Sequence, residues 1–147
     1  MPSAPSSAPA EVIVQQIQYP DAPARYQPGV CNIGPEEIAR RRRSGLVGLA
    51  IAAAVAVVLL AIGAPAWTRL VVWPLLAGGI VSLEQARRHF CAGFAMAGIR
   101  NFGPLGEREA VVESAAMAAD RRAALIMFGY SAAIAGVITV LFVLLPV

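Results

Sequence analysis

The sequence has no lysine and little charge of any kind. All 12 basic residues of the 147 are arginines, nine residues are acidic, and the net charge is +3. Charged residues make up 14% of the chain, whereas an ordinary soluble domain has about 25%. Hydrophobic residues reach 58%, a share that excludes a disordered chain and is atypical of soluble enzymes. The composition therefore predicts a small membrane protein.

Cysteine and histidine are also scarce. Two cysteines are too few for a disulfide framework, and one histidine excludes a haem held by two histidines of one chain. The candidate thiol or metal residues are Cys31, Cys91 and His89. These residues are compatible with a thiol pair, a metal site or a persulfide carrier. Since positions two apart do not face each other on a helix, we expect Cys91 to be a packing residue and His89 an interfacial one. We expect no cofactor.

Ionisable groups are absent from the apolar runs, with Arg69 at one edge as the exception. Ion-coupled transporters and proton pumps usually place such a group within the membrane, so a self-contained pump is disfavoured. The arginines stand beside apolar runs and are not interleaved with aromatic residues, which indicates membrane topology and not nucleic-acid binding. We identify no catalytic residue and predict that the chain is not an enzyme.

Residues 1–34 form a tail rich in proline and alanine, which we expect to be extended and cytoplasmic. Within it, residues 11–19 (EVIVQQIQY) lack proline and favour an extended conformation. This strip is either a short apolar segment of a flexible tail or a strand that adds to a partner's sheet edge.

Residues 35–99 are predicted to form a helical hairpin in the membrane. Asn32 or Gly34 suits a helix cap, and Pro35 suits the first turn, so a helix should begin near Pro35 and continue into the first apolar run. Eighteen residues of that run cover about 27 Å, close to the hydrocarbon thickness of a bilayer. Spans are expected at about residues 45–63 and 67–84, with a short link that makes them antiparallel and a kink at Pro74.

Residues 89–99 (HFCAGFAMAGI) are apolar but too short to span a membrane. They either continue the second helix or lie in the membrane interface with Phe90 and Phe94 on one face. In residues 100–147, a turn at 101–106 should precede a helix from Glu107 to Asp120, which can run directly into a third span at about residues 123–146.

The arginines indicate how the chain is oriented. All of those near the predicted spans except Arg69 fall on one side, which the positive-inside rule assigns to the cytoplasm. The prediction is an all-α, multi-pass protein of a bacterial inner membrane with three transmembrane helices, the N-terminus inside and the C-terminus outside. Trp67 would lie in the outer aromatic belt, and Trp73 would pack against another helix. Contacts with anionic lipid or a partner are assigned to Arg40, Arg41, Arg42, Arg43, Arg87 and Arg88.

Small residues recur in all three spans, and their spacing allows helices to approach closely, within one chain or between chains. The helix-packing candidates are Gly45, Gly48, Gly78, Gly79, Gly129, Ala133 and Gly136.

A set of short motifs brackets the hairpin. An Asn-x-Gly-x-x-Glu helix start is followed by the hairpin and then by a cysteine and a Gly-Ile pair, at Asn32, Gly34, Glu37, Ile38, Arg41, Cys91, Gly98 and Ile99. In these features residues 31–99 resemble a small inner-membrane helical-hairpin domain that is sometimes fused to a rhodanese. The resemblance implies a membrane-embedded hairpin able to dimerise, and a link to sulfur chemistry through the fusion partners. The family has proline after the cysteine, where this chain has Ala92, so the resemblance does not extend to a role for Cys91.

Taken together, the sequence favours a non-catalytic accessory or scaffold subunit of a larger membrane assembly, with membrane lipids and protein partners or further copies of itself as its contacts. Two alternatives stay open. One is a thiol- or metal-dependent membrane protein that uses Cys31 and Cys91, and the other is a homo-oligomeric transport component.

Overall fold

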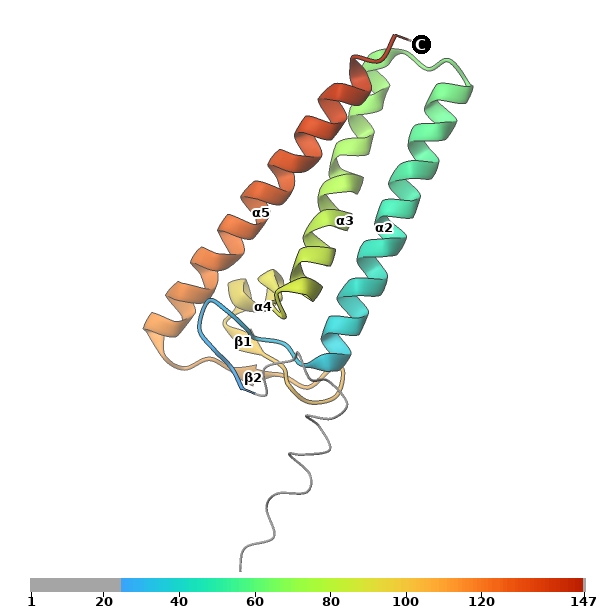
Figure 1. Ribbon diagram of the computed structural model, residues 1–147. Coiled ribbons are helices and arrows are strands. Elements are labelled where there is room, and N and C mark those ends of the chain that lie inside the picture. The colour runs from blue at the N-terminus through green and yellow to red at the C-terminus, as the bar shows by residue number, and fades with distance from the viewer. Residues whose placement is uncertain (1–24, 147) are drawn as a thin grey trace, which may run out of the picture.

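The computed structural model describes residues 25–146, and the predicted strip at residues 11–19 lies outside them. Three long helices stand side by side, and short elements close one end, which we call the base (Figure 1). All three are long and apolar enough to cross a membrane. In chain order the elements are α2 (Pro35–Ala61), the 3-10 helix η1 (Ala66–Val71), α3 (Val72–Arg87), α4 (Ala92–Ala97), β1 (Ile99–Arg100), β2 (Glu109–Ala110) and α5 (Ser114–Val143).

Helix α2 begins at Pro35 as predicted, with Gly34 as its N-cap. Proline suits this position because the first amides of a helix have no partner within it, and Glu36 and Glu37 place negative charge at the positive end of the helix dipole. The helix continues without a break through the four arginines at residues 40–43 into the apolar run.

Pro74, where a kink was expected, does not interrupt helix α3. The chain enters the second span as the 3-10 helix η1 and becomes α-helical at Val72, so Pro74 lies in the first turn of α3, where no helical hydrogen bond is lost. Trp73 does pack against another helix, as predicted, because its indole Nε1 donates to the Ala132 carbonyl of α5 at 3.0 Å.

Residues 89–99 do not continue the second helix, and Phe90 and Phe94 do not share one face. Helix α3 ends at Arg87, and His89 adopts a left-handed backbone conformation (φ 54°) that turns the chain into α4. Both phenylalanines are buried: Phe90 packs with Ala92, Ala95, Ala124 and Met127, whereas Phe94 packs with Ile33 and Cys91. The two phenylalanines therefore belong to different clusters, because Phe90 precedes α4 whereas Phe94 lies within it.

The helix expected from Glu107 begins only at Ser114. Before it, β2 pairs antiparallel with β1, with Ile99 opposite Ala110 and Arg100 opposite Glu109. The backbone pairing, together with an ion pair from Arg100 Nε to Glu109 Oε2 at 2.9 Å, outweighs the local helical spacing. From Ser114 the helix then runs unbroken into the third span, as predicted.

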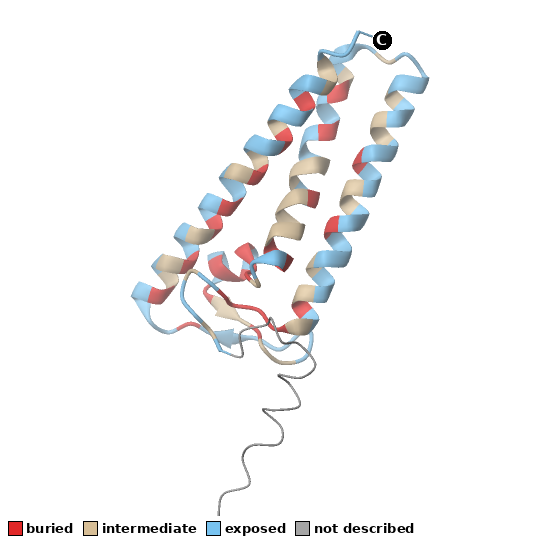
Figure 2. Cartoon of the chain, in the orientation of Figure 1, coloured by how far each residue is buried: buried red, intermediate tan, exposed pale blue. Residues whose placement is uncertain are grey.

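The three long helices form a row with α3 between α2 and α5 (Figure 1). Only 11%, 17% and 22% of the most apolar window of the first, second and third helices is buried inside the chain. Exposed positions accordingly cover much of the outer surface of α2 and α5, whereas half of the positions of α3 are of intermediate exposure (Figure 2). Most of this apolar surface must be covered by lipid or by another protein.

The α2–α3 contact depends on three of the small residues. A Cβ added at Gly79 would lie 2.6 Å from Leu49 Cδ2, and one at Gly45 would lie 2.8 Å from Leu83 Cδ2. At Gly48 it would lie 3.4 Å from the Gly79 Cα. The other candidates do not contribute to this contact. Nothing lies within 4 Å of a Cβ added at Gly78 or Gly129, one added at Gly136 would lie 3.6 Å from Trp73 Nε1, and Ala133 is exposed.

At the end of the row opposite the base, Arg69 joins η1 to the end of α5, a role that the sequence did not indicate. Its side chain is buried, and Nη1 donates to the carbonyl oxygens of Phe142 at 3.1 Å and Leu145 at 2.9 Å. Its guanidinium also lies 5.5 Å from the centre of the Phe142 ring. A cation that binds the last carbonyls of α5 is favoured by the negative end of the helix dipole.

Candidate functional site

The chemistry-bearing residues converge at the base, where the segment before α2 meets the segment before α4. Asn32 is fully buried, and its amide bonds both sides of the Cys91 backbone: Nδ2 donates to the carbonyl at 3.0 Å, and Oδ1 accepts from the amide at 2.6 Å. One side chain thus reproduces the two-way pairing of a β-ladder. We call this pair of bonds the Asn32 clasp.

Backbone bonds extend the clasp on both sides. The amides of Asn32 and Ile33 donate to the His89 carbonyl at 3.2 and 3.3 Å. The Gly34 amide donates to the Asn101 carbonyl at 2.7 Å, and the Asn101 amide donates to the Asn32 carbonyl at 3.0 Å. A Cβ at Gly34 would lie 3.0 Å from the backbone of Phe102, so the close approach requires glycine. Three distant segments are thereby tied into one joint.

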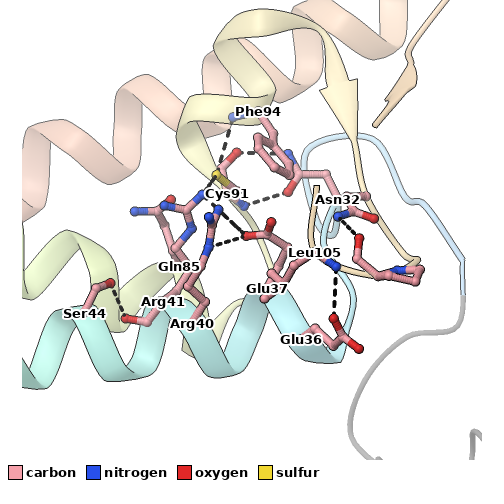
Figure 3. Close-up of polar contacts among 12 residues, drawn as sticks. Asn32, Glu36, Glu37, Arg40, Arg41, Ser44, Gln85, Cys91, Phe94 and Leu105 are labelled. Carbon is pink, nitrogen blue, oxygen red and sulfur yellow. Dashed lines mark hydrogen bonds and ion pairs between the residues drawn. The ribbon is translucent and has the colours of Figure 1, made fainter. Parts of the chain in front are cut away.

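The Cys91 sulfur lies inside this joint and is the N-cap of α4. Its Sγ accepts from Arg41 Nη2 at 3.0 Å and from the Phe94 amide at 3.4 Å (Figure 3). Gln85 Oε1 accepts from the next amide of α4, that of Ala92, at 3.1 Å. Two of the unpaired amides at the start of this short helix are therefore satisfied by side chains, one by the N-cap Cys91 and the other by Gln85 of α3.

Arg41 reaches Cys91 from a charged cluster on α2 that surrounds the buried Glu37. The Glu37 carboxylate is 2% exposed and pairs with Arg40 Nη2 at 2.7 Å and Arg41 Nη2 at 3.7 Å. The Arg41 guanidinium also lies 5.8 Å from the centre of the Phe94 ring. Arg41 thus differs from Arg42 and Arg43, whose side chains are exposed, because it belongs to the interior of the base.

A second anchor ties the tail to α5. Asp120 is fully buried, and its carboxylate accepts from the Gly29 amide at 2.6 Å and the Tyr26 hydroxyl at 2.9 Å. Burial, and then the hydrogen bond to Asp120, raise the pKa of Tyr26 to about 12. The root of the tail is therefore fixed at two points, Asp120 and the Asn32 clasp.

The Tyr26–Asp120 contact predicts a pH dependence. Because the pKa of Tyr26 is higher in the folded chain than its ordinary value near 10, the stabilisation is complete below pH 10 and is lost as the pH rises to about 12. We expect the Tyr26 phenolate, measured by absorbance as the difference from Tyr26→Phe, to form near pH 12, and at lower pH in Asp120→Asn. Tyr26→Phe should cost about 1 kcal/mol of unfolding free energy. Titration of Tyr26 near pH 10 in the folded chain would contradict the contact.

The candidate thiol and metal residues do not assemble into a metal site. Cys31 is buried, and its thiol donates to the Ile33 carbonyl at 3.9 Å, whereas His89 is partly exposed and contributes its backbone carbonyl to the joint. Burial raises the pKa of Cys31 to about 11, which keeps the thiol protonated at neutral pH. Within residues 25–146 no group of three His, Cys, Asp or Glu side chains could hold a metal ion.

This burial predicts how the two thiols react. Cys31 and Cys91 are both 0% exposed, so a maleimide reagent should modify neither in the folded chain and both after denaturation. The measurement is the mass shift of the intact chain with time, with Cys31→Ser and Cys91→Ser variants to assign each adduct. Modification of either residue in the folded chain as fast as that of an unfolded one would contradict the structure.

The base also includes Arg87 and Arg88, grouped around one carboxylate. Glu84 accepts from Arg87 Nη2 at 2.7 Å, from Arg88 Nε at 3.2 Å and from the Tyr130 hydroxyl of α5 at 2.6 Å. The Arg88 guanidinium lies 5.3 Å from the centre of the Tyr130 ring. The end of α3 is thereby joined to α5 by charge as well as by apolar packing.

Sequence reasoning identified Asn32, Arg41 and Cys91 but missed Gln85, Asn101 and Asp120. Asp120 precedes two arginines and so resembled an exposed interfacial charge, although an acidic residue on the apolar repeat Ala116–Ala124 was a signal of burial. Compared with protein-family models, curated proteins and solved structures, the chain matches none of them. Its function must therefore be argued from the geometry.

Proposed function

We propose that this chain is a non-catalytic scaffold of a cell membrane, anchored by three spans, that presents its N-terminal tail to a protein partner. One observation carries the proposal: the reactive and charged groups of the joint are buried and bonded within the chain. Cys91, Glu37 and Asp120 each have their partners inside the fold and are closed to solvent. Such an arrangement fixes segments in place and leaves none of these three groups accessible to a substrate.

The proposed orientation places the base in the cytoplasm. The arginines of α2, of the end of α3 and of the start of α5 all lie at the base, and Arg69 lies at the opposite end. This distribution supports a cytoplasmic base under the positive-inside rule. Because the native cysteines are buried, orientation is tested with single added cysteines at the exposed positions Arg108 and Trp67. A membrane-impermeant maleimide added outside intact cells should label Trp67→Cys only, and the reverse pattern would refute the orientation.

The apolar strip at residues 11–19 is the proposed contact with the partner, because the tail leaves the base from a fixed root. The test is purification of the tagged full chain from its native membrane after cross-linking, with quantitative mass spectrometry. A variant with serine at Val12, Ile13 and Val14 should lose the stoichiometric partner. A control with serine at Ala4, Ala8 and Ala10 should keep it. A wild-type chain recovered without a stoichiometric partner would refute the scaffold role.

The hydrogen bond from Arg41 to the Cys91 sulfur favours a second candidate, a thiol-dependent role that is exercised when the base opens. In that case Cys91→Ser should abolish the cellular activity while the unfolding free energy stays within about 1 kcal/mol of wild type. Loss of activity only in proportion to loss of folded protein would refute it.

A further inference from the structure

A cavity of about 550 Å³, open on one side, lies at the base between the end of α3 and the start of α5. Phe90, Ile126 and Met127 contribute apolar walls, and Arg87 and Arg88 contribute the charged ones. The volume falls within the range of about 300–1,000 Å³ that is usual for small-molecule sites. None of the contacts that form the Asn32 clasp uses this cavity.

The charged walls have a surplus of positive charge. Glu84 is one carboxylate that pairs with two guanidiniums, so the three side chains together have a net charge of +1. Glu84 binds Arg87 through Nε and Nη2 and Arg88 through Nε. A guanidinium has five N–H donors in a fixed plane, so both arginines are held in place while further donors remain for an anion.

The cavity lies where both helices change from charged to apolar. On α5 the pair Arg121 and Arg122 is followed at once by the apolar run that contains Ile126, and on α3 the apolar run ends at Glu84. In a membrane-spanning chain this boundary lies at the level of the lipid headgroups. A ligand that matches the walls has an anionic group beside the arginines and an apolar chain beside Ile126 and Met127.

We propose that this cavity binds one anionic phospholipid, with its phosphate on Arg87 and Arg88 and an acyl chain along Ile126 and Met127. The proposal rests on the membrane location given above. A free phosphate would gain nothing from the apolar walls, whereas a phospholipid satisfies both kinds of surface. Bound there, the lipid joins the end of α3 to α5 beside the root of the tail at Gly29, which also lines the cavity.

The test uses the full chain in a neutral detergent, with native mass spectrometry to count bound lipid during titration with phosphatidylglycerol or with phosphatidylcholine of the same acyl chains. Wild type should retain one phosphatidylglycerol and bind phosphatidylcholine more weakly. The double variant Arg87→Gln/Arg88→Gln should bind phosphatidylglycerol about tenfold to thirtyfold more weakly. The matched control Arg25→Gln/Arg108→Gln makes the same charge change at exposed positions outside the cavity and should change affinity by less than about twofold.

Equal loss in the two double variants would overturn the site, because it would mean diffuse electrostatic attraction. Equal affinity for the two lipids, or full competition by inorganic phosphate, would refute the proposal that the ligand is an anionic phospholipid. If the Arg87/Arg88 variant fails to fold, Ala123→Phe fills the cavity and keeps every charge. Lost phosphatidylglycerol binding in that variant supports the site, and unchanged binding refutes it. Failure of the scaffold proposal is distinguishable, because it appears as a missing partner in the native membrane and not in this titration.

Discussion

Replacing Asn32 with alanine is expected to lower the unfolding free energy by about 2–4 kcal/mol. The substitution removes both bonds of the Asn32 clasp. It leaves the buried Cys91 amide without a partner, whereas the Cys91 carbonyl keeps its bond from the Ala95 amide at 3.0 Å. A buried amide without a partner costs roughly 1–3 kcal/mol because water cannot replace the lost bond, and the lost bond to the carbonyl adds about 1 kcal/mol. Equilibrium unfolding in mixed detergent micelles, followed by far-UV circular dichroism, measures the change.

Two further variants separate the hydrogen bonds from simple loss of volume. Asn32→Leu keeps a branched side chain of at least the same volume but makes neither bond, so it should be destabilised to a similar extent. Ser44→Ala removes an exposed hydrogen bond from a side chain to the backbone carbonyl of Arg41, and it should change stability by less than about 0.5 kcal/mol. If Asn32→Ala behaves like Ser44→Ala, the clasp does not hold the base together.

The clasp also explains why Cys91 is closed to reagents. Its backbone is held by Asn32 and its sulfur by Arg41, so opening the segment before α4 requires both contacts to break. Removing the Asn32 contact lowers the free energy of this opening. In Asn32→Ala, maleimide labelling of Cys91 in the folded chain should therefore become detectable, while Cys31 stays protected. Labelling of both residues together would indicate global unfolding instead of local opening.

The three long helices were predictable because a membrane permits few solutions. Backbone groups in lipid must bond within their own segment, so an uncharged run of 18 or more residues is read directly as a helix. The start at Pro35 was predictable for a local reason as well, since proline and acidic residues suit the first turn. These features depend on short stretches of sequence and on the solvent, not on tertiary contacts.

The base was not predictable in the same way, because distant contacts decide its structure. Residues 89–99 have a helical repeat, yet the backbone is left-handed at His89, so the preceding helix does not continue through this segment. The local sequence does not predict a left-handed conformation at a residue other than glycine. Glu109–Ala110 became a strand only because Ile99–Arg100 lies beside it. Asn32 was expected at most to cap the helix that follows, whereas it bonds a residue 59 positions away.

The other large effect is expected at the glycines between α2 and α3. Gly79→Ala should destabilise the chain by about 1–3 kcal/mol, the usual cost of adding a methyl group to a packed contact. The new Cβ would lie 2.6 Å from Leu49 Cδ2 and 3.1 Å from the Leu49 amide nitrogen. Since a backbone atom is involved, a change of the leucine rotamer alone cannot relieve the contact, and the helices must separate. Unfolding in mixed micelles measures the loss.

The neighbouring glycine provides a matched control. Nothing lies within 4 Å of a Cβ at Gly78, so Gly78→Ala should be neutral or stabilising by up to about 1 kcal/mol, the intrinsic preference of a helix for alanine. Leu49→Ala combined with Gly79→Ala should recover part of the stability, because the closest contact is to the leucine side chain. Additive losses in that double variant would mean that the two residues are not in contact, and equal effects of alanine at Gly78 and Gly79 would mean that the α2–α3 interface does not depend on close approach.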